Sequence, residues 1–239
     1  MSTRVVSDAM RAYYERRAAE YDDWWRGTGL FAERERPGWS EEVREVIDGM
    51  RALSPARVLD VACGTGFLTR HLRGDVVALD QSPRMVAIAS PRAPAARVVR
   101  GDAVPLPFAD GEFERVFTSH FYGHLLPPER AWFVAEALRV GAELVVVDSA
   151  RRPDTPAEQW QVRRLNDGSR HRVYKRFFTP EELAAELGGG SVLHAGRWFV
   201  AIAACRRRRA AAAGPPQSPA APATMLAAPA HAMIPSISG

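Results

Sequence analysis

Short apolar runs alternate along the chain with longer segments in which apolar residues recur every three or four positions. Such alternation predicts the strands of a largely parallel sheet, connected by helices. The strands are expected at residues 57–61, 76–79, 97–100, 114–119, 144–147, 191–195 and 198–204. The helices are expected at residues 9–25, 39–50, 83 onward, 127–140 and 180–187.

The stretch from Arg57 to Leu68, RVLDVACGTGFL, has the pattern of a buried strand, a glycine turn and the first turn of a helix. Asp60 interrupts the apolar run near its carboxyl end. Gly64 and Gly66 allow a tight turn and a close approach of the backbone to a bound molecule. The expected helix, reaching to about residue 72, would add free N–H groups and the positive end of its dipole. The pattern therefore predicts a nucleotide-type site at the edge of the first strand.

Enzymes that bind dinucleotides place a third glycine in this turn, where this chain has Thr69. The turn is followed by two further motifs, so that DVACGTG, VVALDQS and VVRGDAVPLPF occur in order. Together they resemble the class I S-adenosylmethionine (SAM) dependent methyltransferases, from about Tyr13 to Cys205. The resemblance implies a Rossmann-like α/β fold: a seven-stranded, mostly parallel sheet with helices on both faces, an antiparallel last strand and extra N-terminal helices. It also implies SAM as the cofactor.

Asp80 ends the second expected strand, 20 residues after Asp60. This spacing is usual for a carboxylate that binds both ribose hydroxyls, although a strand-end Asp can also be a simple turn residue. In the family that the motifs resemble, a methionine at the place of Met85 packs on adenine. The acid and the amide at the places of Asp102 and Ala103 hydrogen-bond the adenine edge. The residues expected to bind the cofactor are Tyr14, Arg17, Tyr21, Asp60, Ala62, Gly64, Gly66, Asp80, Gln81, Met85, Asp102, Ala103 and Ser119.

The N-terminal segment has one aromatic face. Its members recur at helical spacing and are Met10, Tyr13, Tyr14, Arg17, Ala18, Tyr21, Trp24 and Trp25. Such a stripe is more often core packing than a ligand wall, but a buried arginine within it needs a partner. The segment YYERRAAEYDDWW resembles the first helix of quinone-biosynthesis-type methyltransferases, which folds over the cofactor. The resemblance implies that Tyr14, Arg17 and Tyr21 reach the methionine end.

The end of the fourth strand, SHFYGHLL, places His120, Tyr122 and His124 within five positions. In the resembled family the methyl acceptor usually binds just beyond this strand. Histidine is a suitable general base near neutral pH. His124 is expected to be the base, with Tyr122 orienting the acceptor and His120 contacting the methionine end of the cofactor. Taken alone, each histidine is equally well explained as a structural residue that caps a loop or holds the next helix. No third metal ligand follows at a recognisable spacing, so no metal is expected.

Composition adds few constraints. The net charge is +4, and Arg206 to Arg209 account for it, leaving 28 basic and 28 acidic residues elsewhere. A nucleic-acid partner is therefore not expected. Cys63 and Cys205 give no disulfide framework, and neither a signal peptide nor an apolar run long enough to span a membrane is evident. These features favour a cytoplasmic protein.

Two segments differ from the rest of the chain. Residues 149–178 are polar and rich in arginine, with interspersed aromatic residues, and are expected to form part of the acceptor pocket above the sheet. Some of these arginines could pair with an anionic acceptor or only solvate a surface. Residues 206–239 hold four arginines and then mostly Ala and Pro, without an acidic residue. The expected organisation is a methyltransferase domain, 1–205, and a disordered Arg/Ala/Pro-rich tail, 206–239.

The sequence thus favours an enzyme that transfers a methyl group from SAM to a small molecule by in-line attack, with a quinol-like or phenol-like carbon or oxygen as acceptor. Two alternatives come from other classes. An NAD(P)-dependent oxidoreductase is disfavoured by Thr69 and by the downstream GDAxxLPF motif. A catalytically silent SAM-binding module is disfavoured by the crowded SHFYGHLL segment.

Overall fold

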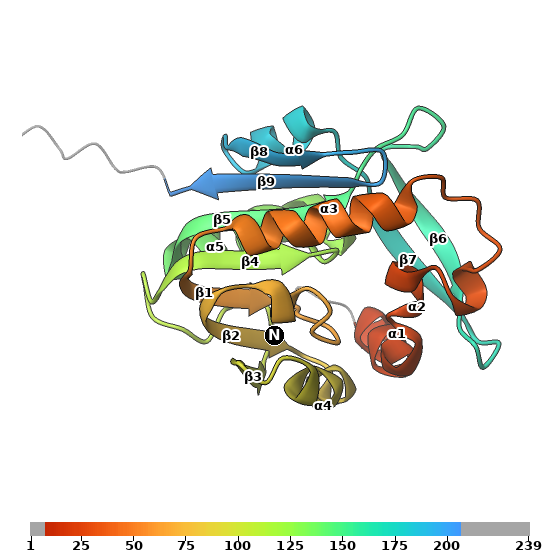
Figure 1. Cartoon of the computed structure of the whole chain (residues 1–239), viewed down its shortest axis with the longest axis horizontal. Helices are drawn as coiled ribbons and strands as arrows, with labels where there is room; N and C mark the ends of the chain where they lie inside the picture. Colours follow the sequence, from red (N-terminus) through yellow and green to blue (C-terminus); the bar gives the residue numbers. More distant parts are fainter. Residues whose placement is uncertain (1–7, 207–239) are drawn as a thin grey trace, which may run out of the picture. The chain divides into compact units, whose positions relative to one another are not determined.

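The computed structural model describes residues 8–206, and Figure 1 shows how their helices and strands are arranged. The predicted tail lies outside the described residues, except for Arg206. The strands are β1 (Ala56–Val61), β2 (Gly74–Asp80), β3 (Ala96–Arg100), β4 (Phe113–Ser119), β5 (Gly141–Ser149), β6 (Glu158–Arg164), β7 (Arg170–Arg176), β8 (Ser191–Ala195) and β9 (Phe199–Cys205). The helices are α1 (Asp8–Arg17), α2 (Asp23–Arg26), α3 (Trp39–Ala52), α4 (Pro83–Arg92), α5 (Pro127–Val140) and α6 (Pro180–Glu186).

Seven strands form one sheet in the order β3-β2-β1-β4-β5-β9-β8. Strands β1 to β5 pair in parallel, whereas β9 runs antiparallel to both of its neighbours. The predicted Rossmann-like fold with an antiparallel last strand is therefore confirmed. From β1 the next strands, β2 and β3, are added on one side, whereas β4 pairs with the other side of β1 and is followed outward by β5. The strand order therefore reverses between β1 and β4. In open α/β sheets this reversal point is where ligands bind, beyond the carboxyl ends of the strands.

The sheet is covered on both faces by apolar side chains. Because successive side chains of a strand point to opposite faces, Leu59 and Val61 of β1 join one core cluster and Val58 joins the other. The neighbouring strands follow the same alternation, with Val77 on the first face and Val76 on the second. This burial on both faces explains the continuous apolar runs in the sequence.

Helices supply the outer layers. Phe133 and Ala137 of α5 are fully buried in the first cluster, and Val46 and Met50 of α3 are buried in the second. Figure 1 shows α3 lying across one face of the sheet. Among residues 8–206, no helix has the length and apolar character needed to cross a membrane.

The expected helix after the glycine turn is absent, which corrects the prediction. Only a 3₁₀ turn, Thr69–His71, follows Gly66 before β2 begins at Gly74. The crossover from β1 to β2 is about the shortest that a parallel pair tolerates, so it leaves no room for a longer helix. The helix dipole invoked from the sequence therefore does not contribute to the site.

The N-terminal segment also differs from the single helix expected over residues 9–25. Helix α1 ends at Arg17, a 3₁₀ turn covers Ala18–Glu20, and α2 begins at Asp23. The break brings Asp22 to the glycine turn, where its carboxylate accepts a hydrogen bond from the Thr65 hydroxyl at 2.5 Å. The predicted aromatic stripe is thereby divided between two short helices.

The arginine-rich segment between β5 and α6 contains a two-stranded antiparallel sheet, β6–β7, which was not predicted from the sequence. In Figure 1 this hairpin, α1 and α2 gather at the edge of the main sheet where the parallel strands end. The expected position of the segment, above the sheet, agrees with this arrangement.

Candidate active site

Two adjoining hollows lie beyond the carboxyl ends of β1, β2 and β4. The smaller has a volume of about 50 Å³ and the larger about 710 Å³. Four residues line both: Tyr14, Tyr21, His120 and His124. The remaining residues around the smaller hollow are Ala62, Gly64, Leu79, Asp80, Gln81, Met85, Gly101, Ala103, Ser119 and Phe121. Most of the predicted cofactor-binding residues are therefore brought together at the smaller hollow.

The two glycines of the turn have different environments. A Cβ on Gly64 would stand 3.4 Å from the Tyr21 ring, on the side of the smaller hollow. A Cβ on Gly66 would instead stand 3.3 Å from Ala89 of α4. Both glycines have positive φ, 57° and 75°. Gly64 thus faces the candidate site, whereas Gly66 permits close packing of the turn against α4, which differs from the prediction that both face the ligand.

Asp80 is held in place by backbone donors. Its two carboxylate oxygens accept hydrogen bonds from the amides of Gly64 and Ser82, each at 2.9 Å. Burial raises the pKa of Asp80 to about 6, although these hydrogen bonds oppose the shift. The carboxylate links the glycine turn to the start of α4, and Met85 in the first turn of α4 lines the same hollow.

Asp60 lies beneath the turn and lines neither hollow. The Thr69 hydroxyl donates to its carboxylate at 2.6 Å. Burial raises the pKa of Asp60 to about 7, with this hydrogen bond acting in the opposite direction. The residue that replaces the third glycine of a dinucleotide motif therefore has a structural role here: its side chain satisfies a buried carboxyl group.

Asp102 is also outside both hollows. Its side chain is half exposed and forms a salt bridge of 3.2 Å with Arg11 of α1. The neighbouring Ala103 does line the smaller hollow, as does Gly101. The salt bridge uses one carboxylate oxygen, Oδ1, and the expected contact of Asp102 with a bound ring stays a prediction.

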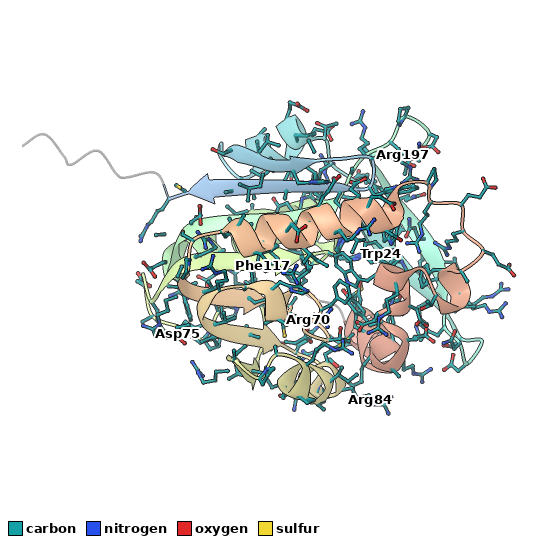
Figure 2. All side chains as sticks on the ribbon, viewed as in Figure 1. Trp24, Arg70, Asp75, Arg84, Phe117 and Arg197 are labelled. Atoms are coloured by element: carbon teal, nitrogen blue, oxygen red, sulfur yellow. The ribbon has the colours of Figure 1, made fainter. Side chains whose placement is uncertain are left out.

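His120 directly follows β4 and adopts a φ of 52°, which is uncommon for any residue except glycine. Its ring packs against Trp24, with 4.5 Å between centroids, and Figure 2 labels this tryptophan near the start of α3. Its Nδ1 lies 3.5 Å from the Ser149 hydroxyl and 3.8 Å from Asp148. Its Nε2 is buried and has no hydrogen-bond partner within residues 8–206. Burial lowers the pKa of His120 to about 3, so the ring is neutral.

His124 has a defined tautomer. Its Nδ1 lies 2.6 Å from the carbonyl oxygen of Tyr174, and because a carbonyl only accepts, Nδ1 carries the proton. The Nε2 atom therefore keeps a lone pair. Burial lowers the pKa of His124 well below its usual range, and the charges of Lys175 and Arg163 lower it further. His124 therefore places a neutral imidazole, with the Nε2 lone pair free, at the junction of the two hollows.

Tyr122 lies elsewhere, which corrects the role expected for it. It is 1% exposed in the core, packs against Phe178 and donates its hydroxyl to Glu186 at 3.0 Å. It lines neither hollow, because successive residues of the 3₁₀ turn Tyr122–His124 point in different directions. Its place beside His124 in the sequence gave a false indication of proximity to the acceptor.

The larger cavity is lined by the N-terminal segment, the loop before α3, and the β6–β7 hairpin. Arg17, predicted at the methionine end, lines this cavity and not the smaller hollow. It donates to the Tyr13 hydroxyl and lies 5.3 Å from the Tyr21 ring centroid. The arginine expected to need a partner in the aromatic stripe therefore has several.

A polar network beneath the larger cavity was not predicted from the sequence. The ammonium of Lys175 on β7 donates to Asp148 at the end of β5, and both side chains are almost fully buried. Burial raises the pKa of Asp148, but the positive charge of Lys175 and the hydrogen bonds from Lys175 and the Ser149 amide leave it below its usual range. Lys175 is the only lysine in the chain, which is the one signal that marks it in the sequence.

Comparisons with known proteins agree with this geometry. A family model described as "Methyltransferase domain" matches residues 58–143. The demethylmenaquinone methyltransferase of Renibacterium salmoninarum is 40% identical over 111 residues, covering 44% of this chain and 46% of that protein. The enzyme of the same name from Beutenbergia cavernae is 39% identical over 121 residues, covering 48% and 50%. The chain thus spans about half the length of these curated relatives.

Comparison with solved structures covers more of the chain than the sequence relatives do. The DhpI–SAM–HEP complex is 26% identical, with a TM-score of 0.64, and the comparison covers 86% of this chain and 99% of DhpI. The DhpI–SAH complex is 27% identical, with a TM-score of 0.63, covering 84% and 97%. The similarity therefore reaches well beyond the glycine turn, into the N-terminal segment and the strands after β5. These comparisons confirm the resemblance that the three sequence motifs indicate: the chain contains a methyltransferase domain and is similar to the class I SAM-dependent methyltransferases.

Proposed function

We propose that the protein is an enzyme that transfers the methyl group of SAM to a small molecule held in the larger cavity. One observation carries this proposal: the two hollows meet at Tyr14, Tyr21, His120 and His124. A group bound in the smaller hollow would face a molecule in the larger one across this junction. When bound, SAM supplies a methyl carbon activated by a positively charged sulfur.

The residues around the smaller hollow fit such a cofactor. The Asp80 carboxylate is placed to accept hydrogen bonds from ribose hydroxyls, and Met85 offers an apolar surface for a base. The amide of Ala103 is a donor for the base edge. The rings of Tyr14 and Tyr21 would stabilise positive charge at the junction.

The smaller hollow must widen to hold a nucleoside, because its volume of about 50 Å³ is far below that of ordinary ligand pockets, which is about 300–1,000 Å³. Tyr14 and Tyr21 come from the N-terminal segment, which reaches over the sheet from outside it. A shift of this segment would enlarge the hollow without disturbing the strands.

His124 is the proposed general base. Its Nδ1–H is fixed by the carbonyl of Tyr174, so Nε2 is left to take the proton of an acceptor hydroxyl. His120 is the second candidate, but its ring is enclosed by Trp24 and Trp25. The chain's contribution is to hold the nucleophile in line with the methyl carbon and to remove its proton.

A quinol-like or phenol-like acceptor is proposed, with methyl transfer to carbon or oxygen. The curated relatives named above are demethylmenaquinone methyltransferases, and the larger cavity presents several aromatic faces, among them Tyr13, Phe31 and Phe177. An aromatic acceptor would stack on such faces.

Methyl transfer from labelled SAM to a panel of phenols and quinols tests the proposal. In His124→Gln we expect turnover to fall by about 10²–10⁴-fold with SAM affinity nearly unchanged, because a general base is lost. His71→Gln is the control, since His71 lies in the 3₁₀ turn after β1 and lines neither hollow. Because burial lowers the pKa of His124, the wild-type rate should show no loss between pH 8 and pH 6 from protonation of this group.

Other outcomes would favour the alternatives. SAM binding with no methylation of any acceptor in a broad metabolite screen would favour a silent module. Binding of NAD(P) in preference to SAM would favour an oxidoreductase. Wild-type turnover in both His124→Gln and His120→Gln would show that neither histidine is a general base and that the enzyme acts by positioning the acceptor alone.

A further inference from the structure

The larger cavity has an unusual charge balance. Seven cationic side chains line it: Arg17, Arg34, Arg36, Arg152, Arg163, Arg164 and Lys175. Only Glu20 and Glu35 contribute carboxylates to the same wall. The chain as a whole is nearly balanced, with 32 basic and 28 acidic residues. The excess of positive charge is therefore a property of this cavity.

Most of these cations have no carboxylate partner. Lys175 is paired with Asp148, and Arg152 lies 3.4 Å from Asp154. The other five arginines make no salt bridge to any carboxylate of residues 8–206. Glu20 is already engaged, because it accepts a hydrogen bond from the amide of Asn166 at 2.8 Å.

Two of the unpaired arginines have donors to spare. The guanidinium of Arg34 lies 4.7 Å from the Phe31 ring centroid and donates no hydrogen bond to a described residue. Arg163 directs two of its nitrogens to one oxygen, Oε1 of Gln161, at 3.3 and 3.1 Å. By contrast, Arg36 stacks 3.9 Å over Trp39 and donates to a backbone carbonyl.

The cluster repels itself in the absence of an anion. Burial lowers the pKa of Arg34, and the positive charges of Arg163 and Arg17 add to this effect. Burial and the charge of Arg34 lower the pKa of Arg36 to about 10. An anion in the cavity would relieve this repulsion.

We propose that the methyl acceptor carries an oxyanionic group, a carboxylate, phosphate or phosphonate, which Arg34 and Arg163 bind. This inference rests on the methyl transfer proposed above and adds the chemical class of its substrate. A guanidinium presents paired N–H donors in a planar fork that matches two oxygens of such a group. The aromatic faces of the cavity then hold the ring, and the charged group fixes which end of the molecule meets His124.

The test compares hydroxylated ring acids with their uncharged primary amides, and a parallel set of ring phosphonates. Dissociation constants are measured by calorimetry with S-adenosylhomocysteine present, and transfer is measured with labelled SAM. Acids should bind more tightly than their amides by about 10- to 150-fold, the worth of hydrogen bonds between charged groups. Carboxylates and phosphonates are separate arms, and whichever shows the larger ratio identifies the group.

Variants show which arginines cause the preference for acids over amides. Arg34→Gln and Arg163→Gln should each remove most of the preference for the acid, with the amide affinity unchanged. Arg163→Lys should restore part of it, because the charge returns without the fork. Arg97→Gln on β3 is the matched control, since Arg97 is exposed and lines neither hollow.

The two proposals fail in different ways. If neutral acceptors are methylated as well as acids and neither arginine variant changes the ratio, the oxyanion inference is wrong and the methyltransferase proposal stands. If acids bind through these arginines but no acceptor is ever methylated, the inference about the cavity holds and the proposed activity is wrong.

Discussion

Ala62 and His120 both adopt a positive φ, 57° and 52°, although neither is glycine, and both line the smaller hollow. Such conformations persist only where the surroundings enforce them, and they concentrate at functional sites. The amide of His120 donates to the carbonyl of Val147 at 2.9 Å, so the neighbouring strand fixes the turn. Each residue is the first after a parallel strand, where the chain must leave the sheet abruptly. The sequence shows no sign of this strain.

Three glycine-to-alanine variants distinguish a loss of SAM binding from a loss of stability through backbone strain. Gly64, Gly66 and Gly111 all have positive φ, so each variant should lose about 1–2 kcal/mol of stability through backbone strain. Only Gly64→Ala should also weaken SAM binding, because only its Cβ would enter the smaller hollow. Gly111→Ala is the control for strain, since nothing lies within 4 Å of its Cβ. Thermal melts and calorimetry measure the two effects, and an equal loss of SAM affinity in Gly66→Ala would contradict the assignment.

Asp60 should make the stability of the protein depend on pH. An unfolded aspartate ionises near pH 4, whereas burial raises the pKa of Asp60 to about 7 in the folded state. Between these values the folded state binds more protons, so the contribution of Asp60 to stability is present below pH 4 and is lost as the pH rises to 7.

Asp60→Asn should remove this dependence. At pH 8 the variant should be more stable than wild type by up to about 4 kcal/mol, and near pH 4 the difference should vanish. Asp75→Asn is the control, because Asp75 is largely exposed. Urea denaturation at both pH values gives the comparison. A constant difference between the variant and wild type across this range would show that Asp60 does not carry the effect.

The N-terminal segment is held to the sheet by a few polar contacts. Asp22 accepts a hydrogen bond from Thr65 in the glycine turn and pairs with Arg92 of α4, each at 2.5 Å. Within α1, Glu15 accepts a hydrogen bond from Ser82, the residue that caps α4. These contacts tie a segment that lines both hollows to the elements that form the smaller one. Widening the smaller hollow by a shift of this segment would loosen them.

Asp22→Ala should release the segment without unfolding the sheet. Amide hydrogen exchange in residues 8–26 should speed up by about 10-fold or more, because the hydrogen bonds from Thr65 and Arg92 to the Asp22 carboxylate, worth about 1.5–3 kcal/mol each, are lost. Asp48→Ala is the control, since its salt bridge with Arg51 is exposed and worth about 0–1 kcal/mol. Unchanged exchange in Asp22→Ala would mean that apolar packing alone holds the segment.

At the scale of the whole molecule, the sheet is complete at Cys205. Strand β9 pairs along its length with β5, and its residues Val200 and Ile202 are fully buried. Both core clusters are closed by side chains of this strand. Within the described part of the chain, the buried residues of both clusters extend no further than Ala204.

Removal of residues 206–239 should therefore leave the melting temperature and SAM affinity unchanged, because a segment of mostly Ala and Pro buries little apolar surface. Differential scanning calorimetry of the full and shortened chains tests this. A fall of several degrees would show that the tail contributes to the folded body.

Much of the fold was predictable because its strands are buried on both faces and therefore appear as uninterrupted apolar runs. The helices that cover them carry clear terminal signals, such as Ser82 and Pro83 at the start of α4. The β6–β7 hairpin was missed because it lies outside the main sheet, and β6 alternates between exposed and half-buried residues in a polar sequence. The helix after β1 was wrongly predicted because the length of the crossover, not helix propensity, decides that segment.

The sequence by itself determined the architecture, the resemblance to the SAM-dependent methyltransferases and the glycine turn beside the smaller hollow. These features depend on local periodicity and on short motifs whose residues are contiguous. Tertiary structure alone decided which of those residues share a cavity. It moved Tyr122 into the core, turned Gly66 toward α4 and paired Asp102 with Arg11. It also gathered Arg34 and Arg163, which are far apart in the chain, in the wall of one cavity. The physical reason is that the direction of a side chain at a strand end or in a short turn is set by contacts with distant segments, which no local pattern records.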